Sequence, residues 1–154
     1  IETTIPAYLT ARPSKAFVVL ARQQITARWW KTQRHRHDLY VSSLVLMEAA
    51  GGDAAAAARR SRAIADLPVL DASAEAKHIA SKLLAKGCIP PKAEPDAMHV
   101  GIAAAHGMDV LLTWNCAHLA NAEVLKRVLR IVREMGYEPP QICTPMELMG
   151  GKLP

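Results

Sequence analysis

The chain has 154 residues, of which 51% are hydrophobic, enough to build the core of one globular domain. No stretch approaches the ~20 unbroken apolar residues that a membrane-spanning helix needs. The formal net charge of +5 suits a polyanionic substrate, although many basic proteins of this length bind no nucleic acid. We therefore expect a single domain over residues 1–154 and no membrane partner.

The three cysteines, Cys88, Cys116 and Cys143, lie far apart, and the sequence contains no Cys-x-x-Cys pair. This number and spacing argue against a zinc site and against a disulfide framework. Because disulfides rarely persist in the cytosol, we expect three reduced thiols in a cytoplasmic protein. The chain opens directly in an apolar, strand-like segment, so we also expect a Met and a few more residues before Ile1.

The first half of the chain predicts two strands and three helices. In order, we expect a strand end over 1–5, a helix over 14–34, a strand over 39–41, a helix that carries Glu48, and an alanine-rich helix over 53–65. Ser14, then Ser42 or Ser43, and then Asp53 are side chains suited to capping the three helix starts. The pair Gly51-Gly52 should end the helix that carries Glu48.

The second half continues the alternation of strands and helices. We expect a strand over 67–70, a helix over 73–87, a proline-rich connection over 89–95, a helix that begins near Asp96 and ends at Gly107, a strand over 110–113, a helix over 121–135, a strand over 141–144 and a final helical turn. Apolar strands that alternate with helices favour parallel pairing. The predicted fold class is α/β, a three-layer α/β/α sandwich with a central parallel sheet.

Four polar side chains stand where a predicted strand meets a turn or a helix. They are Glu2, Glu48, Asp96 and Asn115. In one parallel sheet they would gather at its carboxyl edge, where open sheets bind ligands. Carboxylates grouped at such an edge repel one another unless a cation holds them, and hard divalent cations prefer oxygen ligands. The pattern therefore predicts a metal site. Taken singly, Glu48 could be a solvated helix residue and Asp96 an acid that stabilises a helix start.

The order and spacing of these segments resemble those of PIN domains, particularly the VapC-like toxins of type II toxin–antitoxin pairs. The resemblance covers nearly the whole chain. It rests on Ile1-Glu2-Thr3-Thr4, on Glu48, on the run Asp96-Ala-Met-His-Val-Gly-Ile-Ala, and on Leu112-Thr113-Trp114-Asn115. Two positions depart from the family pattern, since PIN domains usually carry Asp where this chain has Glu2 and Asn115.

This resemblance implies an endoribonuclease that depends on Mg²⁺ or Mn²⁺, with Glu2, Glu48, Asp96 and Asn115 as metal ligands. Two ions ~3.5–4 Å apart would clamp an in-line phosphodiester displacement. Because Asn115 carries no charge, we expect one tight site at best and low activity. Thr113 either orients a ligand or a metal-bound water, or is an ordinary strand residue.

The resemblance also implies partners. They are an RNA substrate, a small antitoxin protein that neutralises the chain as a toxin, and a second copy in a homodimer. A different class of function is a PIN-like module that has lost catalysis and binds RNA or protein, which Glu2 and Asn115 motivate. A flavodoxin-like or receiver-type domain is a third interpretation. It is weaker because no Asp-Asp pair follows the first strand and no Lys is placed after the last one.

Further residues near these motifs have structural as well as functional interpretations. We expect structural roles for His99, His106 and His118, although His99 follows Asp96 by one helical turn and could hydrogen-bond to it. The pair Trp29-Trp30, beside basic residues, could stack bases, but a pair at a helix end more often divides between the core and a partner interface, and we favour the interface because Trp30 lies off the apolar face that includes Trp29. The arginines Arg59, Arg60 and Arg62 favour a solvated helix face, with RNA contact as the alternative.

Overall fold

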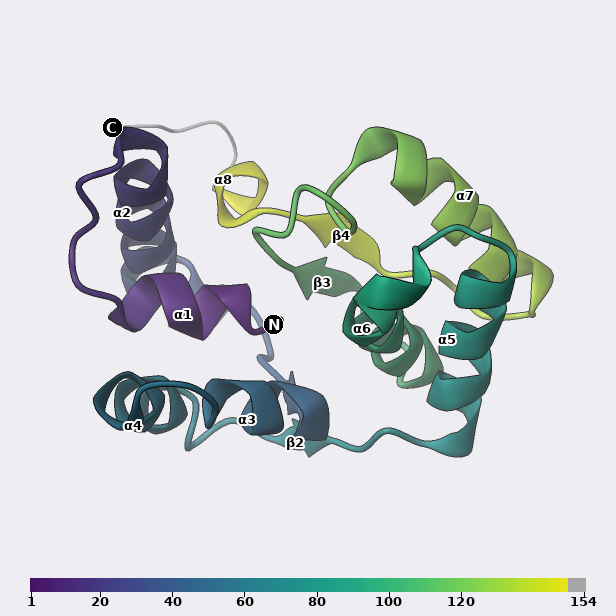
Figure 1. The fold of residues 1–154 in the computed structure, drawn as a ribbon, viewed down its shortest axis with the longest axis horizontal. Coiled ribbons are helices and arrows are strands. Elements are labelled where there is room, and N and C mark those ends of the chain that lie inside the picture. The colour runs from purple at the N-terminus through teal and green to yellow at the C-terminus, as the bar shows by residue number, and fades with distance from the viewer. Residues whose placement is uncertain (150–154) are drawn as a thin grey trace.

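The computed structural model describes residues 1–149 and is mostly helical (Figure 1). Its helices are α1 (Thr4–Thr10), α2 (Phe17–Thr32), α3 (Ser43–Ala49), α4 (Ala54–Ala63), α5 (Ala74–Ala85), α6 (Glu94–Ala105), α7 (Ala122–Glu134) and α8 (Pro145–Leu148), with short 3₁₀ turns η1 (Arg34–Arg36) and η2 (Pro91–Ala93). The strands are β1 (Val41–Ser42), β2 (Val69–Leu70), β3 (Val110–Leu112) and β4 (Gln141–Cys143). Within residues 1–149, none of these helices has the length and apolar character needed to cross a membrane.

Two of the expected caps form, at Ser42 and Asp53, and the structure has further caps at Ser73 and Asn121. Each of these side chains accepts a hydrogen bond from a backbone N–H in the first turn of the helix that follows. Ser14 does not cap α2, which begins at Phe17. Its hydroxyl instead accepts a hydrogen bond from the Ala16 amide before the helix starts. Gly107 adopts a φ of +63° just after α6, a conformation that favours glycine and ends the helix there.

The strands pair in parallel, but they do not form one sheet. β1 pairs with β2, with Val41 opposite Val69, and β3 pairs with β4, with Leu111 opposite Ile142. The α/β class and the parallel pairing are therefore confirmed, whereas the prediction of a three-layer sandwich around a single central sheet is wrong: the strands described here form two separate two-stranded sheets.

The start of the chain contacts both sheets. The expected strand over 1–5 is wrong, since α1 already begins at Thr4. Ile1 and Glu2 lie between the sheets: the Ile1 amino group donates to Tyr40 O at 2.7 Å, and Glu2 N donates to Leu112 O at 3.0 Å. Each of these residues makes one backbone hydrogen bond to a sheet, and neither is part of a strand.

The largest core cluster lies between α5, α6 and α7 against β3, on one side of the molecule (Figure 1). Helices α5 and α6 approach very closely at Gly101. A Cβ atom built at this glycine would lie 2.3 Å from the carbonyl oxygen of Ala76, so only glycine fits there. This contact fixes the position of α6, the helix that carries Asp96 and His99.

A second cluster joins α1, α2 and α8 to the strand ends. Trp29 is 1% exposed and belongs to this core, whereas Trp30 is half-buried with the Arg34 guanidinium 4.6 Å from its ring centre. Two of the three clustered arginines bind helix ends: Arg59 Nε donates to Thr10 O, and Arg60 Nε donates to Ala49 O. All three cysteine thiols are free, as expected.

Candidate metal centre

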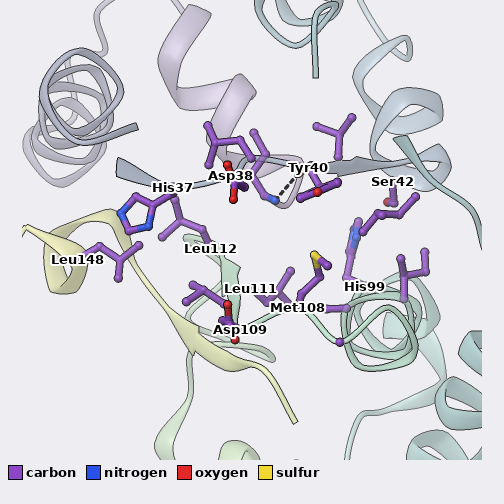
Figure 2. Close-up of a pocket in the computed structure, with 18 of the residues that line it drawn as sticks. His37, Asp38, Tyr40, Ser42, His99, Met108, Asp109, Leu111, Leu112 and Leu148 are labelled. Atoms are coloured by element: carbon purple, nitrogen blue, oxygen red, sulfur yellow. Dashed lines mark hydrogen bonds between the residues drawn. The ribbon is translucent and has the colours of Figure 1, made fainter. Parts of the chain in front are cut away.

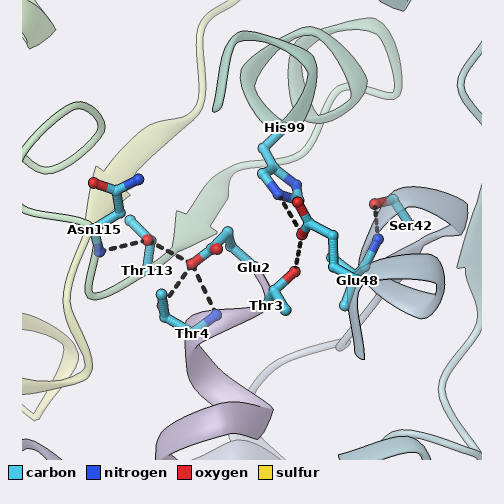
Figure 3. Close-up of polar contacts among 9 residues, drawn as sticks. Glu2, Thr3, Thr4, Ser42, Glu48, His99, Thr113 and Asn115 are labelled. Atoms are coloured by element: carbon cyan, nitrogen blue, oxygen red, sulfur yellow. Dashed lines mark hydrogen bonds and ion pairs between the residues drawn. The ribbon is translucent and has the colours of Figure 1, made fainter. Parts of the chain in front are cut away.

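Three side chains from distant segments converge at the start of α1 (Figure 3). They are Glu2, which precedes α1, Glu48 from α3 and His99 from α6. One carboxylate oxygen of each glutamate and one ring nitrogen of the histidine all lie within 4.8 Å of one another. Among residues 1–149 these are the only His, Cys, Asp or Glu side chains that form such a group of three or more. Carboxylate oxygens and imidazole nitrogens are ordinary metal ligands, so the arrangement could hold a divalent ion.

Glu2 is buried, with 5% of its surface exposed. Its Oε2 accepts hydrogen bonds from the Thr4 amide at 3.1 Å, from the Thr4 hydroxyl, and from the Thr113 hydroxyl at 2.8 Å. A buried carboxylate needs such donors to offset the loss of water. These contacts fix one oxygen of Glu2 and place Thr113, fully buried after β3, beside a candidate ligand.

Glu48 is more accessible, and its side chain is 27% exposed. Its Oε2 lies 3.1 Å from Nε2 of His99 and also accepts a hydrogen bond from the Thr3 hydroxyl. Burial alone would raise the pKa of Glu48, but the hydrogen bonds from His99 and Thr3, together with the charge on His99, leave that pKa below its ordinary value. The carboxylate is thus held in its charged form, which is the form that binds a metal.

Asp96 lies in the first turn of α6, as expected, but outside this cluster. Its Oδ2 is 2.8 Å from Nδ1 of His118, which follows β3 in the chain. The contact considered between His99 and Asp96 is not the one that forms, because His99 reaches across to Glu48 in α3 while Asp96 pairs with His118. The structure therefore brings Glu2 and Glu48 together and sets Asp96 with a different histidine.

Asn115 organises the turn that carries His118. Its amide N donates to the Thr113 hydroxyl at 2.9 Å, and its side-chain Oδ1 accepts a hydrogen bond from the His118 amide at 3.1 Å. Its carbonyl accepts two further backbone hydrogen bonds, from Leu119 and Ala120. One hydrogen-bonded chain thus runs from Glu2 through Thr113, Asn115 and His118 to Asp96.

Sequence reasoning placed His99 and His118 in structural roles and did not assign them to the site. The available signal was local: His99 follows Asp96 by three residues, which puts both on one face of a helix. Nothing local pointed from His99 to Glu48, since their contact depends on how α3 and α6 pack together.

No protein-family model matches this chain, and no curated protein or solved structure is significantly similar to it.

Proposed function

We propose that this chain is a divalent-metal-dependent endoribonuclease that uses Mn²⁺ or Mg²⁺. The observation that carries the proposal is the convergence of two carboxylates, Glu2 and Glu48, with the imidazole of His99. The resemblance to PIN domains, which rests on the motifs around Glu2, Glu48, Asp96 and Asn115, supports the same reaction. The chain as a whole carries a net charge of +5, although the cluster itself is acidic. A positive net charge favours a polyanionic substrate such as RNA.

The donor set fits a divalent ion and favours Mn²⁺. Mg²⁺ binds almost wholly through oxygen, whereas imidazole suits softer transition metals and carboxylates suit Mn²⁺. A bound ion would supply Lewis-acid stabilisation of the phosphate and an activated water. The chain's own part is to hold the ligands in place: Thr4 and Thr113 fix Glu2, and Thr3 fixes Glu48. The Glu48 side chain is 27% exposed, so this ligand is accessible to solvent.

Asp96 and Asn115 are proposed as weaker ligands. His118 engages Oδ2 of Asp96, which leaves the second carboxylate oxygen as the atom that would bind an ion. The Asn115 Oδ1 already accepts a hydrogen bond from the His118 amide and carries no negative charge, so it would be the weaker ligand of the two. Within this proposal, His118 shares a proton with Asp96 at Nδ1 and orients that carboxylate for the reaction.

By its resemblance to VapC-like proteins, we propose that the chain acts as a toxin, that a small antitoxin neutralises it, and that it works as a homodimer in the cytoplasm. RNA is the proposed substrate. Expression of the chain in a host cell, alone and together with a small open reading frame if one adjoins its gene, would test the toxin role. Relief of growth inhibition is the expected result, and unchanged growth in the absence of the neighbour would argue against toxicity.

A second candidate is a PIN-like module that binds RNA or protein without cleaving it. Its supporting observation is that Asp96 and Asn115 are both engaged with His118, so that two carboxylates rather than three converge. Such a module would retain metal binding at Glu2, Glu48 and His99 but would show no turnover.

A cleavage assay separates the two candidates. Mixed cellular RNA is incubated with the chain and Mn²⁺ or Mg²⁺, with and without a chelator, beside the variants Glu48→Gln and Glu94→Gln. Glu94 is an exposed acid at the start of α6 and serves as the matched control. The nuclease predicts cleavage that needs metal, survives Glu94→Gln and is lost in Glu48→Gln. Metal binding without any cleavage would favour the binding module, and Asn115→Asp is then the variant that should restore turnover.

A further inference from the structure

A groove of about 380 Å³ separates the two small sheets (Figure 2). One wall is the segment 36–42, which leads into β1, and the other is the segment 107–112, which contains β3. Residues from α6, among them His99 and Ile102, and residues from α2 and α8, Trp29 and Leu148, complete the lining. The groove therefore runs between two parallel strand edges with helices on either face.

At one end of the groove, Ile1 and Glu2 make backbone hydrogen bonds in the pattern of a strand at the centre of a sheet. On the outer sides, Val41 N donates to Pro68 O and Thr113 N donates to Cys143 O. On the inner sides, Tyr40 O accepts from the Ile1 amino group and Leu112 O accepts from Glu2 N. Successive residues of a strand within a sheet bond to alternate neighbours, and Ile1 and Glu2 do so here.

We propose that this groove is the binding site of an extended apolar strand that is joined to the chain at the amino group of Ile1 and runs parallel to β1 and β3. Such a strand joins the two small sheets into one, in the order β2, β1, added strand, β3, β4. The inward-facing backbone groups of Asp38 and Tyr40 on one wall, and of Val110 and Leu112 on the other, are its partners. This inference does not depend on the proposed ribonuclease activity.

Two further features of the groove fit a peptide strand. The amino group of Ile1 is buried where it meets Tyr40, and a peptide N–H makes the same hydrogen bond without burying a charge. Apolar side chains from the helices that cover the groove, Trp29, Ile102 and Leu148, line it as well, which suits an apolar strand.

The lining also sets the chemistry of the strand. A parallel strand with helices on both faces is apolar at nearly every position. The two walls leave room for about five residues at ~3.3 Å per residue. Apolar, β-branched residues are thus the expected occupants, and their covalent link to Ile1 avoids the entropic cost of binding a separate peptide.

The test compares two versions of the chain, one extended before Ile1 by Met-Lys-Val-Val-Leu-Val and one by Met-Lys-Val-Pro-Leu-Pro. The proline version has similar size and charge but lacks the N–H groups that pair in a sheet. Thermal unfolding and amide hydrogen exchange are measured for both in the presence of a chelator, which removes any effect of metal.

The valine extension is expected to raise Tm by about 5 °C or more over the proline extension. It should also slow exchange of the Tyr40 and Leu112 amides at least tenfold. Equal Tm values and equal exchange at those amides would overturn the proposal. So would protection by acetyl-Val-Val-Leu-Val-amide added as a separate peptide if the joined extension gives none, since the groove would then take a partner's strand.

Discussion

Nε2 of His99 lies 3.1 Å from Oε2 of Glu48, although 51 positions separate the two residues in the chain. The contact ties α6 to α3 and aligns Glu48 with Glu2, whose oxygen is held by Thr113 from the end of β3. The candidate site is therefore assembled from both halves of the molecule.

The pairing of Asp96 with His118 gives a first prediction. Asp96→Asn keeps the shape of the side chain but removes its charge, so we expect metal-dependent RNA cleavage to fall by at least ~100-fold. His118→Ala removes the partner and should lower cleavage less, by about tenfold. Rates are measured on one labelled RNA at saturating Mn²⁺, with Glu94→Gln as the control that keeps its activity. Unchanged cleavage in Asp96→Asn would remove this residue from the reaction.

The lowered pKa of Glu48 predicts a dependence of stability on pH. The folded-state pKa lies below the ordinary value of 4.5, so the unfolded chain binds this proton more readily than the folded one. The stabilising contribution is therefore complete above about pH 4.5 and is lost as the pH falls through the folded-state pKa. Urea unfolding in the presence of a chelator should show a steeper loss of stability below pH 4.5 for the wild type than for Glu48→Gln. Parallel pH profiles for the two proteins would contradict this.

The close contact of α5 with α6 predicts a large effect of one methyl group. In Gly101→Ala the added carbon would collide with the backbone of Ala76, which cannot move aside as a flexible side chain would. We expect a loss of roughly 3 kcal/mol in the free energy of unfolding, the upper end for overpacked sites. Gly51→Ala is the matched control, because its Cβ would lie 3.4 Å from the nearest atom, an ordinary contact. Equal stability of the two variants would show that α5 and α6 can separate at no cost.

Local signals in the sequence predicted much of the fold. Capping side chains such as Ser42 and Asp53 act on atoms three residues away, and they predicted the starts of their helices correctly. The single central sheet was wrong because it depended on a strand over 1–5. The Ile-Glu-Thr-Thr-Ile stretch is compatible with a strand by composition, but the chain turns into α1 at Thr4.

The site was predictable in part for the same physical reason. Glu2 and Glu48 were chosen from their positions at element ends, and the structure brings them together. Asp96 was placed correctly in the first turn of α6, but its partner depends on the loop after β3. The role of His99 required knowledge of the packing of α6 against α3, which no local pattern contains.

The most direct test of the account is a calorimetric titration of Mn²⁺ into the chain at neutral pH. Three matched variants accompany it: Glu48→Gln, His99→Gln, and His78→Gln as a control on the exposed side of α5. The account predicts that the chain binds Mn²⁺ at one site or more. The affinity for Mn²⁺ should fall tenfold or more in Glu48→Gln and in His99→Gln, and it should be unchanged in His78→Gln. No binding to the wild type, or equal binding by all four proteins, would contradict a metal centre at Glu2, Glu48 and His99.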